Sequence, residues 1–308
     1  MVKRMTFKKI LISTLFLLVA LILYSFPQEL QQHINIEQEK KYNKIYLIDE
    51  KKYVSMVDMA SSSTSVNERI KEIVDSLTID SSLNDNIPDG FKPIIPSGTI
   101  LKEFSLQDGL LKLNFNKNFL NVAVDDEEKM IEALVFSLTT INEVKKIMIF
   151  IEGEKLSELP QSHKKIDLYL DRSFGINKVY DISTFYDTKM VTVYYLDSHG
   201  NYYIPISHIV NDENDKIDIV IKNLKTNSFN NSNLSSHLNY QVELMNYEFN
   251  ENNIIMNFNE VLLNSVYDGK LKEEVKYAIY YSIHDTLGID EVVFLINSEQ
   301  IDQFRLEN

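Results

Sequence analysis

An internal duplication constrains the fold of this chain more than any other feature of its sequence. The segment Leu113-Asn114-Phe115-Asn116, followed by Leu120-Asn121, recurs as Met256-Asn257-Phe258-Asn259, followed by Leu263-Asn264. Three further segments recur in the same order, beginning at Tyr46 and Tyr194, at Ile70 and Ile217, and at Ala133 and Ala278. Because loops absorb insertions at little cost, small changes in the offset between copies are expected. The pattern predicts two copies of one small domain.

Each copy is predicted to fold as β(β)-α-β-β-α-β. In the first copy, Ile70, Ile73, Val74 and Leu77 recur at helical spacing, whereas Leu111, Leu113 and Phe115 alternate as in a half-buried strand. The predicted strands are 44–49, 101–106, 110–115 and 146–152 in the first copy and 191–197, 202–206, 241–247, 254–258 and 291–297 in the second. The predicted helices are 65–77, 127–139, 217–224 and 272–286. The fold class is α+β, with two tandem copies of a small sheet that carries two helices on one face.

Several local features support these boundaries. Ser65 and Glu68 have the spacing of a capping box, and Asp125 and Asp126 precede the second helix where an N-cap residue belongs. Since Phe115 and Phe258 share one context, we expect them at equivalent core positions.

The first 27 residues are typical of a signal anchor. Four basic residues precede an uncharged, apolar run from Ile10 to Phe26, and Pro27 ends it. The run is close to the lower length limit for a spanning helix, and the basic flank predicts a cytoplasmic N-terminus. A cleaved signal peptide is the alternative, although the exit sequence Tyr24-Ser25-Phe26 lacks the small residues that cleavage prefers.

The predicted organisation follows directly. It comprises a cytoplasmic basic segment (1–9), a transmembrane signal anchor (10–27), a stalk (28–43), the first domain (44–172), a linker (173–189), the second domain (190–303) and a tail (304–308). This arrangement predicts a single-pass protein of the cell membrane whose two domains lie outside the cytoplasm.

Composition excludes several classes of function. The formal net charge is −14, with 45 acidic and 31 basic residues, and the protein contains no cysteine. Binding to a nucleic-acid backbone needs clustered Lys and Arg, so an acidic body argues against nucleic acid as a partner. The absence of cysteine excludes thiol catalysis, zinc–thiolate sites and disulfides.

No catalytic, cofactor-binding or metal-binding residues are predicted. The six histidines are not spaced as zinc ligands, and we expect structural or solvent-exposed roles for them; they are His33, His163, His199, His208, His237 and His284. Asp212, Glu213 and Asp215 have part of the spacing of a calcium loop but are predicted to start a helix. Of Tyr194, Tyr195, Tyr202 and Tyr203, half are expected in the core; the others, like Tyr280 and Tyr281, are candidates to anchor a partner.

The ordered segments resemble the GerMN domain, which occurs in tandem in GerM-type sporulation and germination proteins. The resemblance covers about Lys44 to Ile301. It rests on Ile95–Leu101, Asp108–Phe115, Phe136–Thr139 with Val144 and Ile147–Gly153, Gly175–Asn177 and Tyr202–Ile206. Many relatives are lipoproteins with a cysteine after the signal, and here an apolar anchor would replace it. The second copy also lacks the Pro-Gly segment before its hairpin.

This resemblance implies a fold similar to the ring-building motifs of secretion assemblies. It also implies a non-enzymatic, extracytoplasmic role in protein interaction or assembly during sporulation or germination. The expected partners are other envelope or sporulation proteins, including further copies of the chain. The alternative is an envelope protein outside sporulation, which either binds the cell wall or is an unrecognised hydrolase, because the parts of a Ser-His-Asp triad need not be adjacent in sequence.

Overall fold

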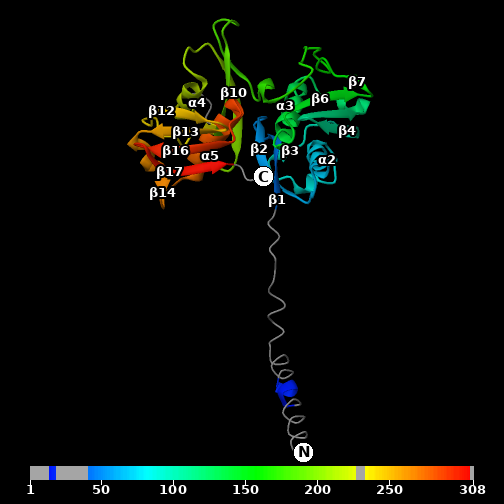
Figure 1. The fold of residues 1–308 in the computed structure, drawn as a ribbon. Coiled ribbons are helices and arrows are strands. Elements are labelled where there is room, and N and C mark those ends of the chain that lie inside the picture. Colours follow the sequence, from blue (N-terminus) through cyan, green and yellow to red (C-terminus); the bar gives the residue numbers. More distant parts are fainter. Residues whose placement is uncertain (1–13, 19–40, 227–232, 306–308) are drawn as a thin grey trace, which may run out of the picture. The chain divides into compact units, whose positions relative to one another are not determined.

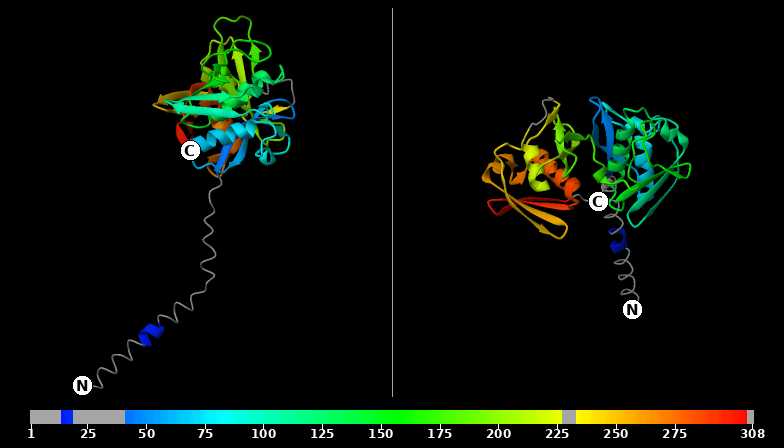
Figure 2. Two further views of the ribbon diagram at one scale, coloured as in Figure 1. Left: turned by 90° about the vertical axis from the view of Figure 1, so that its right-hand side faces the viewer. Right: turned by 90° about the horizontal axis from the view of Figure 1, so that it is seen from above.

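The computed structural model describes residues 14–18, 41–226 and 233–305. Lys41–Asn308 forms one compact unit, which Figure 1 and Figure 2 show from three directions. Residues 14–18 are helical, but none of the described helices is long and apolar enough to cross a membrane. The predicted anchor and stalk lie largely outside the described residues. The first strand, however, begins at Lys41, inside the segment predicted as a stalk.

The predicted elements are present in both halves of the compact unit. The first half contains β1 (Lys41–Asp49), β2 (Val54–Ser61), α2 (Val66–Leu77), β3 (Phe91–Lys92), β4 (Leu101–Gln107), β5 (Leu110–Phe115), α3 (Glu127–Leu138), β6 (Lys146–Ile151) and β7 (Glu154–Lys155). The second half contains β8 (Val179–Asp181), β9 (Lys189–Asp197), β10 (Tyr203–Val210), α4 (Lys216–Lys225), β11 (Leu234–Ser235), β12 (Leu244–Asn250), β13 (Asn253–Phe258), β14 (Val266–Tyr267), β15 (Lys270–Leu271), α5 (Glu273–Leu287), β16 (Glu291–Ile296) and β17 (Glu299–Arg305).

The duplication is visible in the register of the two four-stranded sheets, β4-β5-β6-β7 and β12-β13-β16-β17. Phe115 pairs with Leu101 on one side and Ile151 on the other. Phe258 pairs with Leu244 and Ile296 in the same way. Both phenylalanines are fully buried. The expectation that Phe115 and Phe258 occupy equivalent core positions is therefore confirmed.

The expectation of one sheet per domain with both helices on one face is wrong. The opening hairpins β1–β2 and β9–β10 do not join the four-stranded sheets; with β3, β8 and β11 they form a separate seven-stranded sheet, in which β2 lies beside β10. The helices lie between a hairpin and a four-stranded sheet, as the right-hand view in Figure 2 shows for the second domain. Ten of the 12 residues of α3 are buried, because both of its faces are covered.

Each domain fastens its second helix to its opening hairpin in the same way. The backbone N–H of Tyr46 donates to the hydroxyl of Ser137 in α3 at 2.8 Å. The equivalent N–H of Tyr194 donates to Ser282 in α5 at 2.9 Å. The hydroxyls of Ser137 and Ser282 are fully buried, so these two bonds attach each helix firmly to the hairpin beside it.

The predicted helix caps are confirmed only in part. The Ser65 hydroxyl accepts from the N–H of Glu68, but the Glu68 carboxylate bonds the N–H of Thr64, one residue before the cap. Asp126 is the N-cap residue of α3, yet its side chain makes no capping bond. The neighbouring Glu127 carboxylate instead accepts from the N–H groups of Gln161 and Ser162, which attaches a later loop to this helix.

Candidate functional site

A cluster of buried polar side chains lies where the two domains meet. The strands β2 and β10 approach antiparallel, and Met56 pairs with Tyr203. Continuing this register by two residues from the Met56–Tyr203 pair places Val54 opposite Pro205. Proline has no N–H to donate. The Asn177 side chain replaces the missing bonds. Its Oδ1 accepts from the N–H of Val54 at 2.9 Å, and its Nδ2 donates to the carbonyls of Val54 and Pro205, both at 2.8 Å.

Equivalent tyrosines of the two copies meet at this junction. The hydroxyls of Tyr46 and Tyr194 lie 2.7 Å apart, and both rings are buried. A residue that contacts its own counterpart is the mark of an isologous interface, so the domains are related by a local pseudo-two-fold axis at this point. The Tyr194 hydroxyl also donates to Asp285.

Arg172 holds the two domains together through an ion pair with Asp285 of α5. The Asp285 side chain is 2% exposed and the Arg172 side chain 16%. The guanidinium also donates to the Thr139 hydroxyl at 3.0 Å and to the carbonyl of Phe136 at 3.2 Å. Arg172 is the last residue of the predicted first domain and contacts α3 of that domain, whereas Asp285 belongs to the second domain, so the cluster crosses the junction.

The charges of this cluster stabilise one another. Burial alone would raise the pKa of the Asp285 carboxyl, but Arg172 and His284 hold it below its usual value. Burial likewise opposes the charge of Arg172, and Asp285 raises the pKa of its guanidinium. Burial raises the pKa of the Tyr46 and Tyr194 hydroxyls, so both remain protonated donors.

A second buried ion pair fixes the segment predicted as a linker. Lys178 donates to Glu128 at 2.7 Å and to Glu132 at 2.8 Å, both on α3. The N–H of Asn177 donates to Glu132 at 3.0 Å. Burial lowers the pKa of the Lys178 ammonium, but the two carboxylates more than compensate and raise it. Residues 177 and 178 are thus held against the first domain, which fixes the start of the second.

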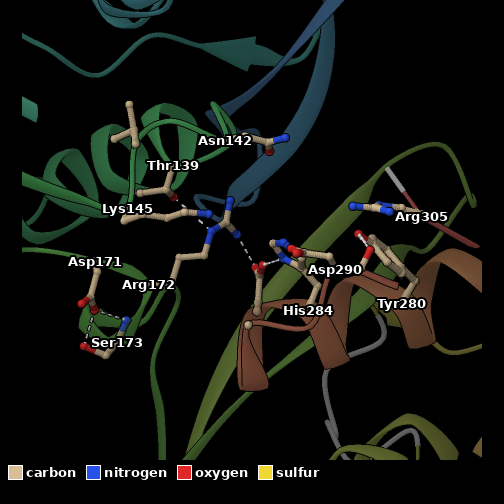
Figure 3. A pocket seen from close by; sticks show the side chains of 13 residues that line it. Thr139, Asn142, Lys145, Asp171, Arg172, Ser173, Tyr280, His284, Asp290 and Arg305 are labelled. Atoms are coloured by element: carbon tan, nitrogen blue, oxygen red, sulfur yellow. Dashed lines mark hydrogen bonds and ion pairs between the residues drawn. The ribbon is translucent and has the colours of Figure 1, made fainter. Parts of the chain in front are cut away.

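A polar pocket of about 480 Å³ opens beside this cluster (Figure 3). Its lining consists of Thr139, Asn142, Val144, Lys145, Asp171, Arg172, Ser173, Tyr280, His284, Asp285, Gly288, Asp290 and Arg305. His284 Nδ1 lies 2.8 Å from Asp285 Oδ1, the arrangement of the His–Asp half of a hydrolase triad. However, the Ser173 hydroxyl donates to Asp171, and the Thr139 hydroxyl donates to the carbonyl of Val135 while accepting from Arg172. Neither hydroxyl is directed at His284.

The other histidines have separate surroundings. His163 is exposed beside Glu158, His199 lies in an exposed turn, and His237 is 4.0 Å from Glu274. His208 is buried in β10, where burial lowers its pKa to about 4. His33 lies outside the described residues. Within 14–18, 41–226 and 233–305, no group of three His, Asp or Glu side chains is placed to hold a metal ion.

Of the three acids with part of a calcium-loop spacing, Asp212 and Asp215 use their carboxylates to bind protein groups. The Asp212 carboxylate accepts from Lys222 at 3.0 Å and from the N–H of Asn214 at 3.0 Å. Asp215 is the N-cap residue of α4, and its carboxylate accepts from the Tyr247 hydroxyl at 2.9 Å. These contacts agree with the prediction that the segment starts a helix.

Several tyrosines expected to be available for a partner are buried. Tyr194 and Tyr195 are in the core and Tyr202 and Tyr203 are half-buried, as the half-core expectation requires. Tyr280 and Tyr281, however, are both buried in α5, so neither can anchor a partner.

The most exposed aromatic side chains of the domains instead belong to Phe185 (86%) and Tyr186 (81%), in the turn between β8 and β9. Asn211 orders this turn, because its Oδ1 accepts from the N–H groups of Ser183 and Thr184 and its Nδ2 donates to the carbonyl of Tyr186. We call residues 183–187 the aromatic loop.

Sequence reasoning missed Arg172, Asp285 and the aromatic loop. Arg172 is one of only four arginines in a chain whose basic residues are mostly lysines. That rarity is a signal, since arginine is favoured where a guanidinium pairs away from water. The adjacent pair Phe185-Tyr186, in a segment of Ser, Thr and Asp, was a second signal, because two large aromatic residues in a polar loop have no core to join.

Known proteins match this fold over most of its length. The model of the Germane family, described as sporulation and spore germination, matches residues 44–157 and 192–302. The chain is 25% identical over 265 residues to the spore germination protein GerM of Bacillus subtilis (strain 168), covering 83% of this chain and 71% of that protein. It superimposes with a TM-score of 0.75 on the solved tandem GerMN domains of the sporulation protein GerM from Bacillus subtilis, at 22% identity. That match covers 85% of this chain and 92% of the other.

Proposed function

Because the chain belongs to the Germane family of sporulation and spore germination proteins, we propose that it is a membrane-anchored, extracytoplasmic docking module that acts without breaking a covalent bond. In this proposal the apolar run from Ile10 to Phe26 anchors the chain, and the two domains bind other envelope or sporulation proteins. Its relative GerM is named as a spore germination protein, which supports a proposed role in spore formation or germination.

The observation that carries the proposal is how the polar groups of the domain junction are used. Arg172, Asp285 and Tyr194 bond one another across the junction, and Asn177 completes the strand pairing. These groups therefore hold two domains at a fixed orientation. A rigid pair of domains presents its surface side chains without an ordering cost, which favours docking.

The aromatic loop is the surface we propose for the partner. Phe185 and Tyr186 are almost fully exposed, while the backbone around them is fixed by Asn211. Tyrosine and other aromatic residues dominate the binding energy of many interfaces, and a pre-ordered loop loses little entropy on binding. The loop thus has both the side chains and the rigidity that a docking element needs.

Crosslinking in the native host during spore formation tests this proposal. The chain should capture an envelope or sporulation protein, and the double variant Phe185→Ser/Tyr186→Ser should lose that capture. Tyr267→Ser is the matched control, because Tyr267 is an exposed aromatic residue elsewhere (78%). The proposal fails if the loop variant captures the same proteins in the same yield as the wild type.

A hydrolase is the second candidate, and only the His284–Asp285 pair in the pocket favours it. In that case His284→Ala would abolish function while folding and partner capture stayed normal. The docking proposal expects His284→Ala to support normal spore formation.

A further inference from the structure

The two four-stranded sheets each end in an edge strand that pairs with nothing on its outer side among the described residues. These strands are β4 in the first domain and β12 in the second, and the register of their neighbours makes them equivalent. Both also carry the same irregularity, between Leu101 and Glu103 in β4 and between Leu244 and Asn246 in β12. An unpaired strand edge offers N–H and C=O groups to another chain unless the protein guards it.

Within the described part of the chain, the first edge is guarded and the second is not. In β4, Lys102 forms an ion pair with Glu152, and the Lys71 ammonium lies 6.0 Å from the centre of the Phe104 ring. Lysine on an edge strand is a common protection against pairing. The sequence of β12, Leu-Met-Asn-Tyr-Glu-Phe-Asn, contains no basic residue and no proline. Two of its apolar side chains, Met245 (59%) and Phe249 (57%), are exposed to solvent.

A groove runs between β12 and α4, beside the open edge. Its volume is about 610 Å³. One face of α4 lines it with Asp218, Ile221, Lys222 and Lys225, and the strand lines it with Leu244 and Met245. An edge strand next to a helix, with an apolar floor between them, is the arrangement that accepts an additional strand by β-augmentation.

We propose that the occupant is a second copy of this chain, with β12 of the two copies paired antiparallel about Tyr247. In this register Tyr247 faces the partner's Tyr247, and Met245 faces the partner's Phe249. The exposed phenyl ring of each copy then lies beside the groove of the other, next to Met245. Each pairing also has a symmetric equivalent, as a two-fold interface requires.

The charges of β12 favour its own copy as the occupant. Glu248 is the only ionisable carboxylate of the strand, and in this register it faces the partner's Asn246. No carboxylate therefore lies directly opposite another, a placement that would destabilise a cross-strand pair. The two four-stranded sheets would merge into one sheet of eight strands. This inference concerns pairing of the chain with itself and does not depend on the sporulation role or on the aromatic loop.

Cysteine crosslinking of the full-length protein in detergent tests the register directly. The chain has no cysteine, so introduced thiols have no background. Directly opposed residues of an antiparallel pair have Cα atoms within the range that a disulfide spans. A mixture of Asn246→Cys and Glu248→Cys proteins should give at least tenfold more disulfide dimer on mild oxidation than either variant alone. Glu103→Cys mixed with Ser105→Cys, the equivalent positions of β4, is the matched control and should remain monomeric.

Three results would overturn the proposal. The first is a yield from the β12 mixture no higher than from the β4 control. The second is preferential crosslinking between a β4 cysteine and a β12 cysteine, which would indicate head-to-tail pairing. The third is capture of a different protein by Glu248→Cys in cells without any dimer.

The double variant Met245→Lys/Phe249→Lys gives an independent test. It should abolish dimers in sedimentation while leaving the circular dichroism spectrum unchanged, since both side chains are exposed. Persistent dimers would contradict the interface.

Discussion

Replacing Asp285 by asparagine tests whether the Arg172 cluster holds the two domains together. The asparagine has nearly the same shape and can still accept from the Tyr194 hydroxyl, so the change removes mainly the negative charge. Arg172 would keep its charge at a site where its side chain is only 16% exposed. Removing one partner of a buried ion pair typically costs 3–5 kcal/mol.

The structure places the expected cost near the lower end of that range. Arg172 would retain bonds to the carbonyl of Phe136 and the hydroxyl of Thr139, and part of its side chain remains in contact with water. We therefore expect Asp285→Asn to lower the free energy of unfolding by about 3 kcal/mol. Urea titration followed by circular dichroism at pH 7 measures this change, with an unchanged slope indicating that the same surface unfolds.

Two further variants separate the charge effect from other causes. Arg172→Met/Asp285→Leu removes both charges and should be more stable than Asp285→Asn alone, because no unpaired charge is buried. Glu158→Gln breaks the exposed pair with Lys165 and should leave the free energy of unfolding nearly unchanged. A cost below about 1 kcal/mol for Asp285→Asn would refute the reasoning, since the ion pair would then behave like an exposed one.

Three other substitutions test separate features. Burial lowers the pKa of His208 to about 4 from its usual 6.5, so on acidification the unfolded state takes up a proton at higher pH than the folded state does. The free energy of unfolding should therefore fall by up to about 3 kcal/mol as pH drops from 6.5 to 4. His208→Gln should flatten that part of the pH profile measured by urea titration. Asn177→Ala should lower the unfolding free energy by about 2–4 kcal/mol in the same assay, since three backbone groups of Val54 and Pro205 lose their partner. Gly288 ends α5 with a φ of 72°, and Gly288→Ala should lower the melting temperature through about 1 kcal/mol of backbone strain, because no atom lies within 4 Å of an added methyl group. An unchanged pH profile in His208→Gln would contradict the role of His208. For Asn177→Ala or Gly288→Ala, a drop in the free energy of unfolding below roughly 0.5 kcal/mol, the size expected of an ordinary surface substitution, would contradict the corresponding argument.

The repeat and its local elements were readable from sequence because they depend on short-range patterns. The alternation around Phe115 and Phe258 placed both residues correctly, and the spacing from Ile70 to Leu77 predicted the buried face of α2. The layer arrangement was also partly encoded. The α3 sequence is apolar on most of its circumference, from Met130 to Leu138, which is typical of a helix covered on both faces.

The domain junction could not be read in the same way. Arg172 and Asp285 are 113 residues apart, and Tyr46 and Tyr194 are 148 apart, so no local pattern connects the members of either pair. The role of Asn177 depends on Pro205, a residue whose missing N–H matters only once two strands from different domains are adjacent. Such contacts follow from tertiary packing, which composition and periodicity do not report.

Spore formation in the native host tests most directly whether this chain works by docking and not by catalysis. Heat-resistant spores would be counted in strains that carry the wild type, His284→Ala or Phe185→Ser/Tyr186→Ser, with equal amounts of folded protein verified in each strain. A docking role predicts normal spore counts for His284→Ala and a loss of spores together with loss of partner capture for the aromatic-loop variant. A loss of spores in His284→Ala with partner capture intact, beside normal counts in the loop variant, would contradict it.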